Sequence, residues 1–170
     1  MSDVSARPRR DADRFLSIYL NDQLAMGIAW RELARRSSKA NQGTETGVAL
    51  AQVASAIAED VETFQRVMRR LGFRRNPVKT VLAAAAERVG RFKPNGRLTN
   101  YSSLSRFEEL ELLIMGIESK KQLWETLGRL AGLGSRLPDI DFTRLAERAR
   151  EQRALLEPHR VRAGSEAFSA

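Results

Sequence analysis

The chain has 170 residues, 42% of them hydrophobic, and a net charge of +8. These values are typical of one globular domain with a core of its own. It has no cysteine, which excludes a disulfide framework and a thiolate metal site. No run of about 18 apolar residues and no signal peptide is visible, so we expect a cytoplasmic protein without a membrane span.

The charge is the first clue to possible partners. Lysine and arginine number 29 against 21 acidic residues, which is compatible with an acidic partner such as nucleic acid. The charges alternate in sign along the chain, and no recognition motif accompanies them. A solvated basic surface is therefore favoured, and any nucleic-acid binding is expected to be non-specific.

The first half of the chain predicts two long helices, because alanine, leucine, glutamate and arginine dominate and period-2 alternation is rare. Residues 1–12 are expected to form a flexible basic arm. The first helix spans about 13–38. The second begins after Thr44 as N-cap and ends near Leu71, where Gly72 supplies the C-terminal glycine.

The second half adds a short helix and two more long ones. Asn76 and Pro77 open the short helix, about 77–89, and a turn-rich loop follows Gly90. The third long helix starts near Ser103 or Ser105 and ends near residue 130. The fourth starts at Asp139 or Asp141 and ends near residue 160, which leaves 161–170 as a frayed tail.

The lengths of the connections predict the topology. Two short links make antiparallel pairs of the first two and the last two long helices. The middle link of about 30 residues is long enough to return the full length of a helix. An all-α, ferritin-like four-helix bundle over 13–160, with a helix-containing crossover between helices 2 and 3, has this order.

Each long helix also directs a polar residue toward its apolar face near mid-length. The third helix has the stripe Phe107, Leu110, Leu113, Ile114, Ile117, Trp124, Leu127 and Ala131, and Lys121 falls inside it. A buried charge must be paired, so we expect an internal polar network of Gln23, Asp60, Glu118, Lys121 and Gln152. The alternative is that Lys121 extends its ammonium to solvent and Gln23 lies at a helix edge.

The loop RFKPNGRLTNY is the most distinctive non-helical segment. Lys93, Asn95, Gly96 and Arg97 are a candidate site for an anion or a partner, since loops often carry recognition. A plain turn that packs the crossover against the helices is the favoured alternative.

The phrases YLNDQLA, IAEDVETFQRVMRRLG, GRFKPNGRL, FEELELLIMGIESKKQLWETL and RLAERAREQRALL carry a resemblance. With the helix order, they make the chain similar to an uncharacterised bacterial family within the ferritin-like superfamily. Catalytic members bind two metals through glutamates and two Glu-x-x-His motifs. This chain has no Glu-x-x-His, and its single histidine, His159, follows Pro158. The resemblance therefore implies the fold without its di-iron centre, with no catalytic residue, metal or cofactor.

The function expected from these observations is non-catalytic binding or assembly. The partner would be an unknown protein or small molecule, and a homodimer is expected by resemblance. Two alternatives stay open. One is a basic protein associated with nucleic acid. The other is a carboxylate-based metal-binding oxidase or storage protein that uses Asp22, Asp60, Glu111 and Glu118.

Overall fold

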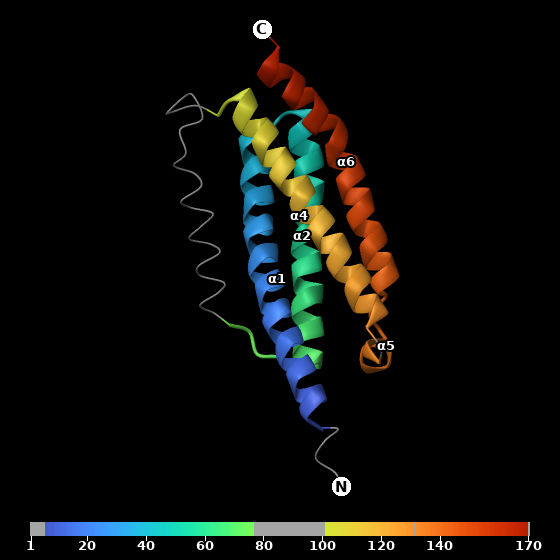
Figure 1. Ribbon diagram of the computed structural model, residues 1–170. Helices are drawn as coiled ribbons and strands as arrows, with labels where there is room; N and C mark the ends of the chain where they lie inside the picture. Colours follow the sequence, from blue (N-terminus) through green and yellow to red (C-terminus); the bar gives the residue numbers. More distant parts are fainter. Residues whose placement is uncertain (1–5, 77–100, 131, 170) are drawn as a thin grey trace.

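The protein is described here from a computed structural model, which covers residues 6–76, 101–130 and 132–169. Within these residues the chain forms five helices and no strand (Figure 1). They are α1 (Ala6–Ala40), α2 (Glu45–Arg70), α4 (Ser103–Arg129), α5 (Leu133–Arg136) and α6 (Phe142–Phe168). The predicted all-α class is confirmed. The short helix expected at 77–89 and the loop with Lys93, Asn95, Gly96 and Arg97 lie outside the described residues.

The four long helices lie side by side (Figure 1). α1 packs along α2 and α4 packs along α6, while α1 also contacts α4 and α2 also contacts α6. α1 and α6 run in one direction, and α2 and α4 run in the other (Figure 1). The two short links therefore make antiparallel pairs, as their lengths predicted.

The ends of the middle link are both held by α1. The Asn76 backbone N–H donates to Asn21 Oδ1 over 2.7 Å, and Asn41 Nδ2 donates to the Tyr101 hydroxyl over 2.8 Å. Asn21 lies in α1 and Asn41 directly follows its last residue, 20 positions further on, which is about 30 Å at 1.5 Å per residue. The link thus joins opposite ends of the four long helices.

Three helix starts are fixed by side-chain caps. Thr44 Oγ1 accepts from the Gly47 N–H over 3.0 Å, Ser102 Oγ accepts from the Ser105 N–H over 3.1 Å, and Asp141 Oδ1 accepts from the Arg144 N–H over 2.9 Å. Each cap satisfies a backbone donor that has no partner inside its helix. Thr44 was predicted from the sequence and Asp141 was one of two predicted starts, whereas Ser102 precedes the predicted Ser103 or Ser105. Gly72 was also predicted, and its φ of 76° places it in the left-handed region that ends a helix.

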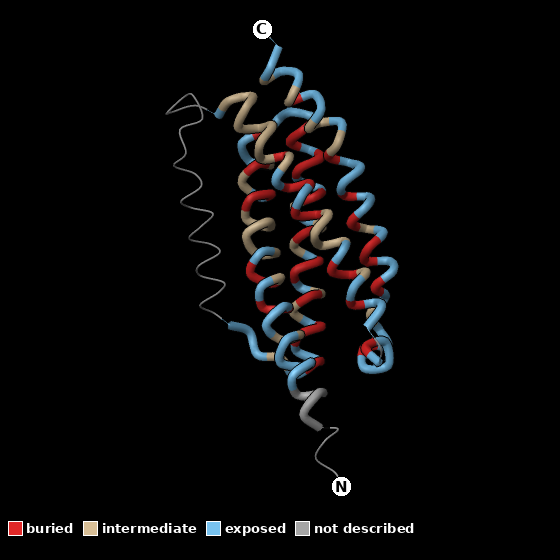
Figure 2. The backbone as a smooth tube through the Cα atoms, in the orientation of Figure 1, coloured by how far each residue is buried: buried red, intermediate tan, exposed pale blue. Residues whose placement is uncertain are grey.

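The core is a continuous apolar cluster along the inner faces of these helices (Figure 2). Leu20, Leu50, Leu110, Leu127 and Leu156 have no exposed surface. They come from all four long helices, so one core unites the chain.

Both ends of the helical region extend further than predicted. α1 already begins at Ala6, so residues 6–12 are helical and are not a flexible arm. α6 continues through Pro158 to Phe168, although a frayed tail was expected after residue 160. Ala163 is buried and the Phe168 ring meets the Phe107 ring edge-on at 5.4 Å. These contacts with α4 stabilise turns that proline and local propensity disfavour.

The helices were also compared with the dimensions of a membrane. Among the described residues, no helix combines the length and the apolar character that a membrane span requires.

Candidate functional site

Three polar side chains meet between α2, α4 and α6. Lys120 Nζ lies 2.5 Å from Asp60 Oδ2 and also donates to Gln152 Oε1. Gln152 Nε2 donates to the same Asp60 oxygen over 2.9 Å. Asp60 and Gln152 are only 2% and 6% exposed. We call Asp60, Lys120 and Gln152 the buried trio.

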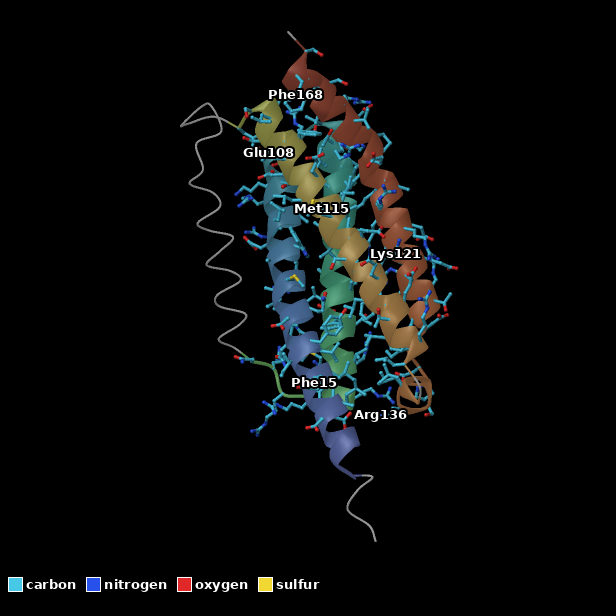
Figure 3. The ribbon with its side chains drawn as sticks, viewed as in Figure 1. Phe15, Glu108, Met115, Lys121, Arg136 and Phe168 are labelled. Carbon is cyan, nitrogen blue, oxygen red and sulfur yellow. The ribbon has the colours of Figure 1, made fainter. Side chains whose placement is uncertain are left out.

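The lysine of this network is Lys120, which corrects the prediction of Lys121. Lys121 Nζ pairs with Glu118 Oε1 on its own helix, three residues away. The two lysine side chains are similarly covered, 15% and 20% exposed, but their carboxylate partners differ: Asp60 is 2% exposed and Glu118 is 37% exposed. Lys121, which is labelled in Figure 3, thus forms a pair with Glu118 at the solvent edge of α4, outside the buried trio.

Lys120 and not Lys121 lies in the buried trio because the buried face of α4 is broad. Gly116, Leu123 and Trp124 are all buried, and Lys120 lies one helical turn from each of them. The predicted stripe omitted Gly116 and Leu123. Including them moves the centre of the buried face toward Lys120 and away from Lys121, which lies about 100° further around the helix. Gly116 and Leu123, at the edge of the apolar pattern, were the sequence signal that identifies Lys120 as the buried lysine.

Burial governs the electrostatics of Lys120. Desolvation lowers the pKa of its ammonium below the usual range, and the neighbouring Arg148 acts in the same direction. The charge of Asp60 and its hydrogen bond oppose that shift. A lysine in this setting keeps its proton mainly because a buried carboxylate lies beside it.

A second cation approaches Asp60 from α6. Arg148 NH2 lies 3.6 Å from Asp60 Oδ1, which is ion-pair range and beyond a hydrogen bond, and it lies 2.9 Å from Glu59 Oε2. Two carboxylates therefore face two cations in this region. The charges of Glu59, Asp60, Lys120 and Arg148 balance.

A cavity of about 40 Å³ adjoins the buried trio between α1, α2 and α4. Since one buried water needs roughly 10–15 Å³ on this measure, there is room for about three waters or a molecule of that bulk. Most of the wall is apolar, from Leu24, Ile57, Val61, Phe64, Ile117 and Leu123. The polar part of the wall comes from Gln23, Asp60, Ser119 and Lys120, and both tryptophans of the chain, Trp30 and Trp124, complete it.

The position of Gln23 on the apolar face of α1 is explained by this cavity and not by the buried trio. It is half-buried on the α1 wall of the cavity, and it makes none of the hydrogen bonds of the buried trio. An amide at this position brings a donor and an acceptor to an otherwise apolar wall. Of the five residues predicted to form one network, the structure brings together Asp60 and Gln152, places Gln23 on the cavity wall, and leaves Glu118 and Lys121 outside.

Another polar cluster lies where α1 ends and α4 begins. The Tyr101 hydroxyl donates to Glu109 Oε2 over 3.0 Å, and Ser37 Oγ donates to the same oxygen over 2.6 Å. Arg36 NH2 lies 3.1 Å from the other Glu109 oxygen. Burial and the charge of Glu109 raise the pKa of Tyr101, although the hydrogen bond from Asn41 acts the other way. This cluster ties α1 to α4 and has no cavity of its own among the described residues.

The side chains in the described part of the chain do not fit a di-iron centre. Within the described ranges, no group of three or more histidine, cysteine, aspartate or glutamate side chains is placed to hold a metal ion. His159 Nδ1 lies 3.1 Å from Thr46 Oγ1, and the buried trio offers one carboxylate beside an ammonium, which repels a divalent cation.

The chain was also compared with known proteins. No protein-family model, no curated protein and no solved structure matches it.

Proposed function

We propose that this protein is a non-catalytic binding protein built on a ferritin-like four-helix bundle, and that it binds a small molecule in the cavity between α1, α2 and α4. The observation that carries the proposal is the cavity beside the buried trio, at mid-length of the helices. An apolar cavity with a few convergent polar groups is the usual form of a small-molecule site. Assembly into a homodimer is a further expectation from the resemblance.

The helix order supports the ferritin-like part of the proposal. The two antiparallel pairs and the link between opposite ends have the arrangement of bundles with one long crossover. In such bundles the metal ligands project inward from facing helices. Here the facing positions supply Asp60 from α2, Lys120 from α4 and Gln152 from α6.

Lys120 supports the non-catalytic part. Its ammonium already neutralises the buried carboxylate, so the trio has no spare negative charge for a cation and no ligand set for redox chemistry. Fold alone assigns no activity.

The first experiment measures metal. Purified, untagged protein is analysed for bound elements and then reloaded with iron(II), manganese and zinc while its melting temperature is followed. We expect no stoichiometric metal and no shift. Stoichiometric metal with a raised melting temperature would favour the oxidase or storage alternative.

The second experiment measures binding. Trp30 and Trp124 are the only tryptophans of the chain and both line the cavity, so their fluorescence reports its occupation. Small apolar probes such as toluene and phenol are titrated, and melting is followed in parallel. A ligand at 100 times its Kd is expected to add about 2.7 kcal/mol to the free energy of unfolding.

A cavity-filling variant controls this experiment. Gly27 lines the cavity, and Val61 Cγ2 at 3.4 Å is the single atom near a Cβ placed there. Gly27→Leu is therefore expected to abolish binding. Gly134→Leu adds the same side chain in α5, where nothing lies within 4 Å, and is expected to bind as the native chain does. Equal binding by both variants would place the probes elsewhere, and a lack of binding by the native chain would refute the proposal.

A further inference from the structure

Two buried polar atoms lack a hydrogen-bond partner within the described part of the chain. They are Asp60 Oδ1, an acceptor, and Trp124 Nε1, a donor. Their residues are 2% and 1% exposed, and both line the cavity. A buried donor or acceptor without a partner is costly and uncommon in a folded protein, so these two atoms need an explanation.

The two residues belong to facing walls of the same site. On α2, Asp60 and Phe64 are one turn apart, and on α4, Lys120 and Trp124 are one turn apart. Asp60 pairs with Lys120 at 2.5 Å, and Phe64 meets Trp124 edge-on with ring centroids 5.6 Å apart. The unpaired acceptor and the unpaired donor therefore come from different helices, at levels about one helical turn apart.

The neighbouring groups do not remove the need for a partner. Arg148 NH2 is the nearest cation to Asp60 Oδ1 apart from Lys120, and 3.6 Å exceeds a hydrogen bond. Trp124 has aromatic rings around it, Phe64 and Phe142, which accept no conventional hydrogen bond.

The chemistry of the cavity limits what can bind. Glu59 and Asp60 already balance Lys120 and Arg148, so an ionised ligand would bring an uncompensated charge into an apolar wall. An uncharged group that donates one hydrogen bond and accepts another matches the two atoms. A hydroxyl has this property, and its carbon body suits the leucine, isoleucine and phenylalanine wall.

We infer that the cavity binds a small uncharged alcohol or phenol whose hydroxyl donates to Asp60 Oδ1 and accepts from Trp124 Nε1. This inference rests on the proposed function, because it specifies the ligand class of the same cavity. The size of the cavity restricts the carbon body to a short chain or a single ring.

The test compares three probes of one shape in the native protein. Phenol donates and accepts, anisole accepts only, and toluene does neither. Binding is followed by tryptophan fluorescence and by melting. We expect phenol to bind about tenfold or more tightly than anisole, and toluene to bind most weakly. Equal affinities for the three would overturn the inference and leave the proposed function intact. Binding by none of them would overturn both.

A pair of variants identifies the donor. Trp124→Phe removes the indole N–H and keeps an aromatic ring, so the affinity for phenol is expected to fall about tenfold while that for toluene stays the same. Trp30→Phe changes the other tryptophan of the wall and is expected to keep the preference for phenol. An unchanged preference in Trp124→Phe would contradict the role of Nε1. Should that variant fail to fold, the comparison of phenol with anisole in the native chain still decides the inference.

Discussion

Lys120 and Lys121 are neighbours in the chain, but their surroundings differ, and so do their contributions to the stability of the fold. Lys120 neutralises a carboxylate that is 2% exposed, and Lys121 neutralises one that is 37% exposed. Exposed pairs contribute little because water screens them, whereas loss of one partner of a buried pair leaves a desolvated charge. The consequence is that adjacent lysines have very different roles in stability.

The first prediction compares two identical substitutions. Lys120→Met is expected to lower the free energy of unfolding by about 3–5 kcal/mol, because Asp60 stays buried without its counter-charge. Lys121→Met is expected to change it by less than about 1 kcal/mol. Denaturant unfolding measures both values.

A double variant separates the lost charge pair from general disruption. Asp60→Leu combined with Lys120→Met removes both charges, so it is expected to cost less than the sum of the two single changes. Equal costs for Lys120→Met and Lys121→Met would contradict the assignment of Lys120 to the buried trio.

Tyr101 gives a prediction about pH. Its pKa is raised in the folded state by burial and by Glu109, above an unfolded value near 10. Above about pH 10 the unfolded chain therefore loses this proton more readily than the folded chain. The stabilising contribution of Tyr101 is complete below that pH and is lost as the pH rises through the folded pKa.

Two measurements check the pH prediction. Absorbance titration of the Tyr19→Phe variant, which has Tyr101 as its only tyrosine, is expected to show ionisation well above the usual range or only on unfolding. Tyr101→Phe is expected to flatten the loss of stability above about pH 10. Ionisation of Tyr101 near pH 10 in the folded protein would contradict its hydrogen bond to Glu109.

At the scale of the elements, close packing between helices decides where glycine is required. A Cβ on Gly116 of α4 would lie 2.6 Å from the Trp30 ring of α1, whereas a Cβ on Gly27 of α1 would meet Val61 Cγ2 at 3.4 Å. Both glycines lie inside helices, where alanine is intrinsically better by roughly 0.5–1 kcal/mol. The neighbour across the helix interface therefore decides whether a glycine-to-alanine substitution stabilises or destabilises the protein.

The third prediction is a pair of glycine substitutions with opposite effects. Gly27→Ala is expected to stabilise the protein by about 0.5–1 kcal/mol, because the helix gains and the contact is ordinary. Gly116→Ala is expected to destabilise it by about 1–3 kcal/mol, because Trp30 must move. Thermal unfolding compares the two, and a stabilising Gly116→Ala would show that the Trp30 ring does not lie against α4.

The last turns of α6 give the fourth prediction. Truncation after Arg160 removes the buried Ala163 and the pair of Glu166 with Arg106 at 2.9 Å, and it uncovers Phe107. We expect a loss of about 1–3 kcal/mol. Phe168→Ala alone, at a ring that is 68% exposed, is expected to cost less than about 1.5 kcal/mol. A truncated protein as stable as the full chain would mean that these turns are frayed.

At the scale of the whole molecule, charge governs long-range behaviour while packing governs the fold. The net charge of +8 attracts polyanions without selecting among them. Many arginines are engaged between helices, as Arg36 is with Glu109 and Arg162 is with Glu45.

The fifth prediction follows from this net charge. Association with duplex DNA is expected to be equal for unrelated sequences at low salt and to be lost by about 0.2 M salt, because it depends on counterion release. Fluorescence anisotropy over a salt series measures it. Binding that persists at high salt, or that prefers one sequence, would favour the nucleic-acid alternative over the proposed small-molecule site.

The sequence by itself determined the helical class, the cap at Thr44, the antiparallel pairs and two of the three residues of the buried trio. These features follow from local chemistry and from a periodicity that is visible in the letters. Its pattern predicted Lys121 in place of Lys120, because the width of the buried face of α4 depends on the helices packed around it. The continuation of α6 past residue 160 was equally invisible, since it depends on contact with Phe107.

Among the described residues, only the tertiary structure decided that Gln23 borders a cavity, that Asp60 and Trp124 each have a buried atom without a hydrogen-bond partner, and that Glu118 and Lys121 lie outside the buried trio. A cavity is the space left when four helices with particular side chains pack together. No single helix contains that information, because every wall of the cavity comes from a different part of the chain.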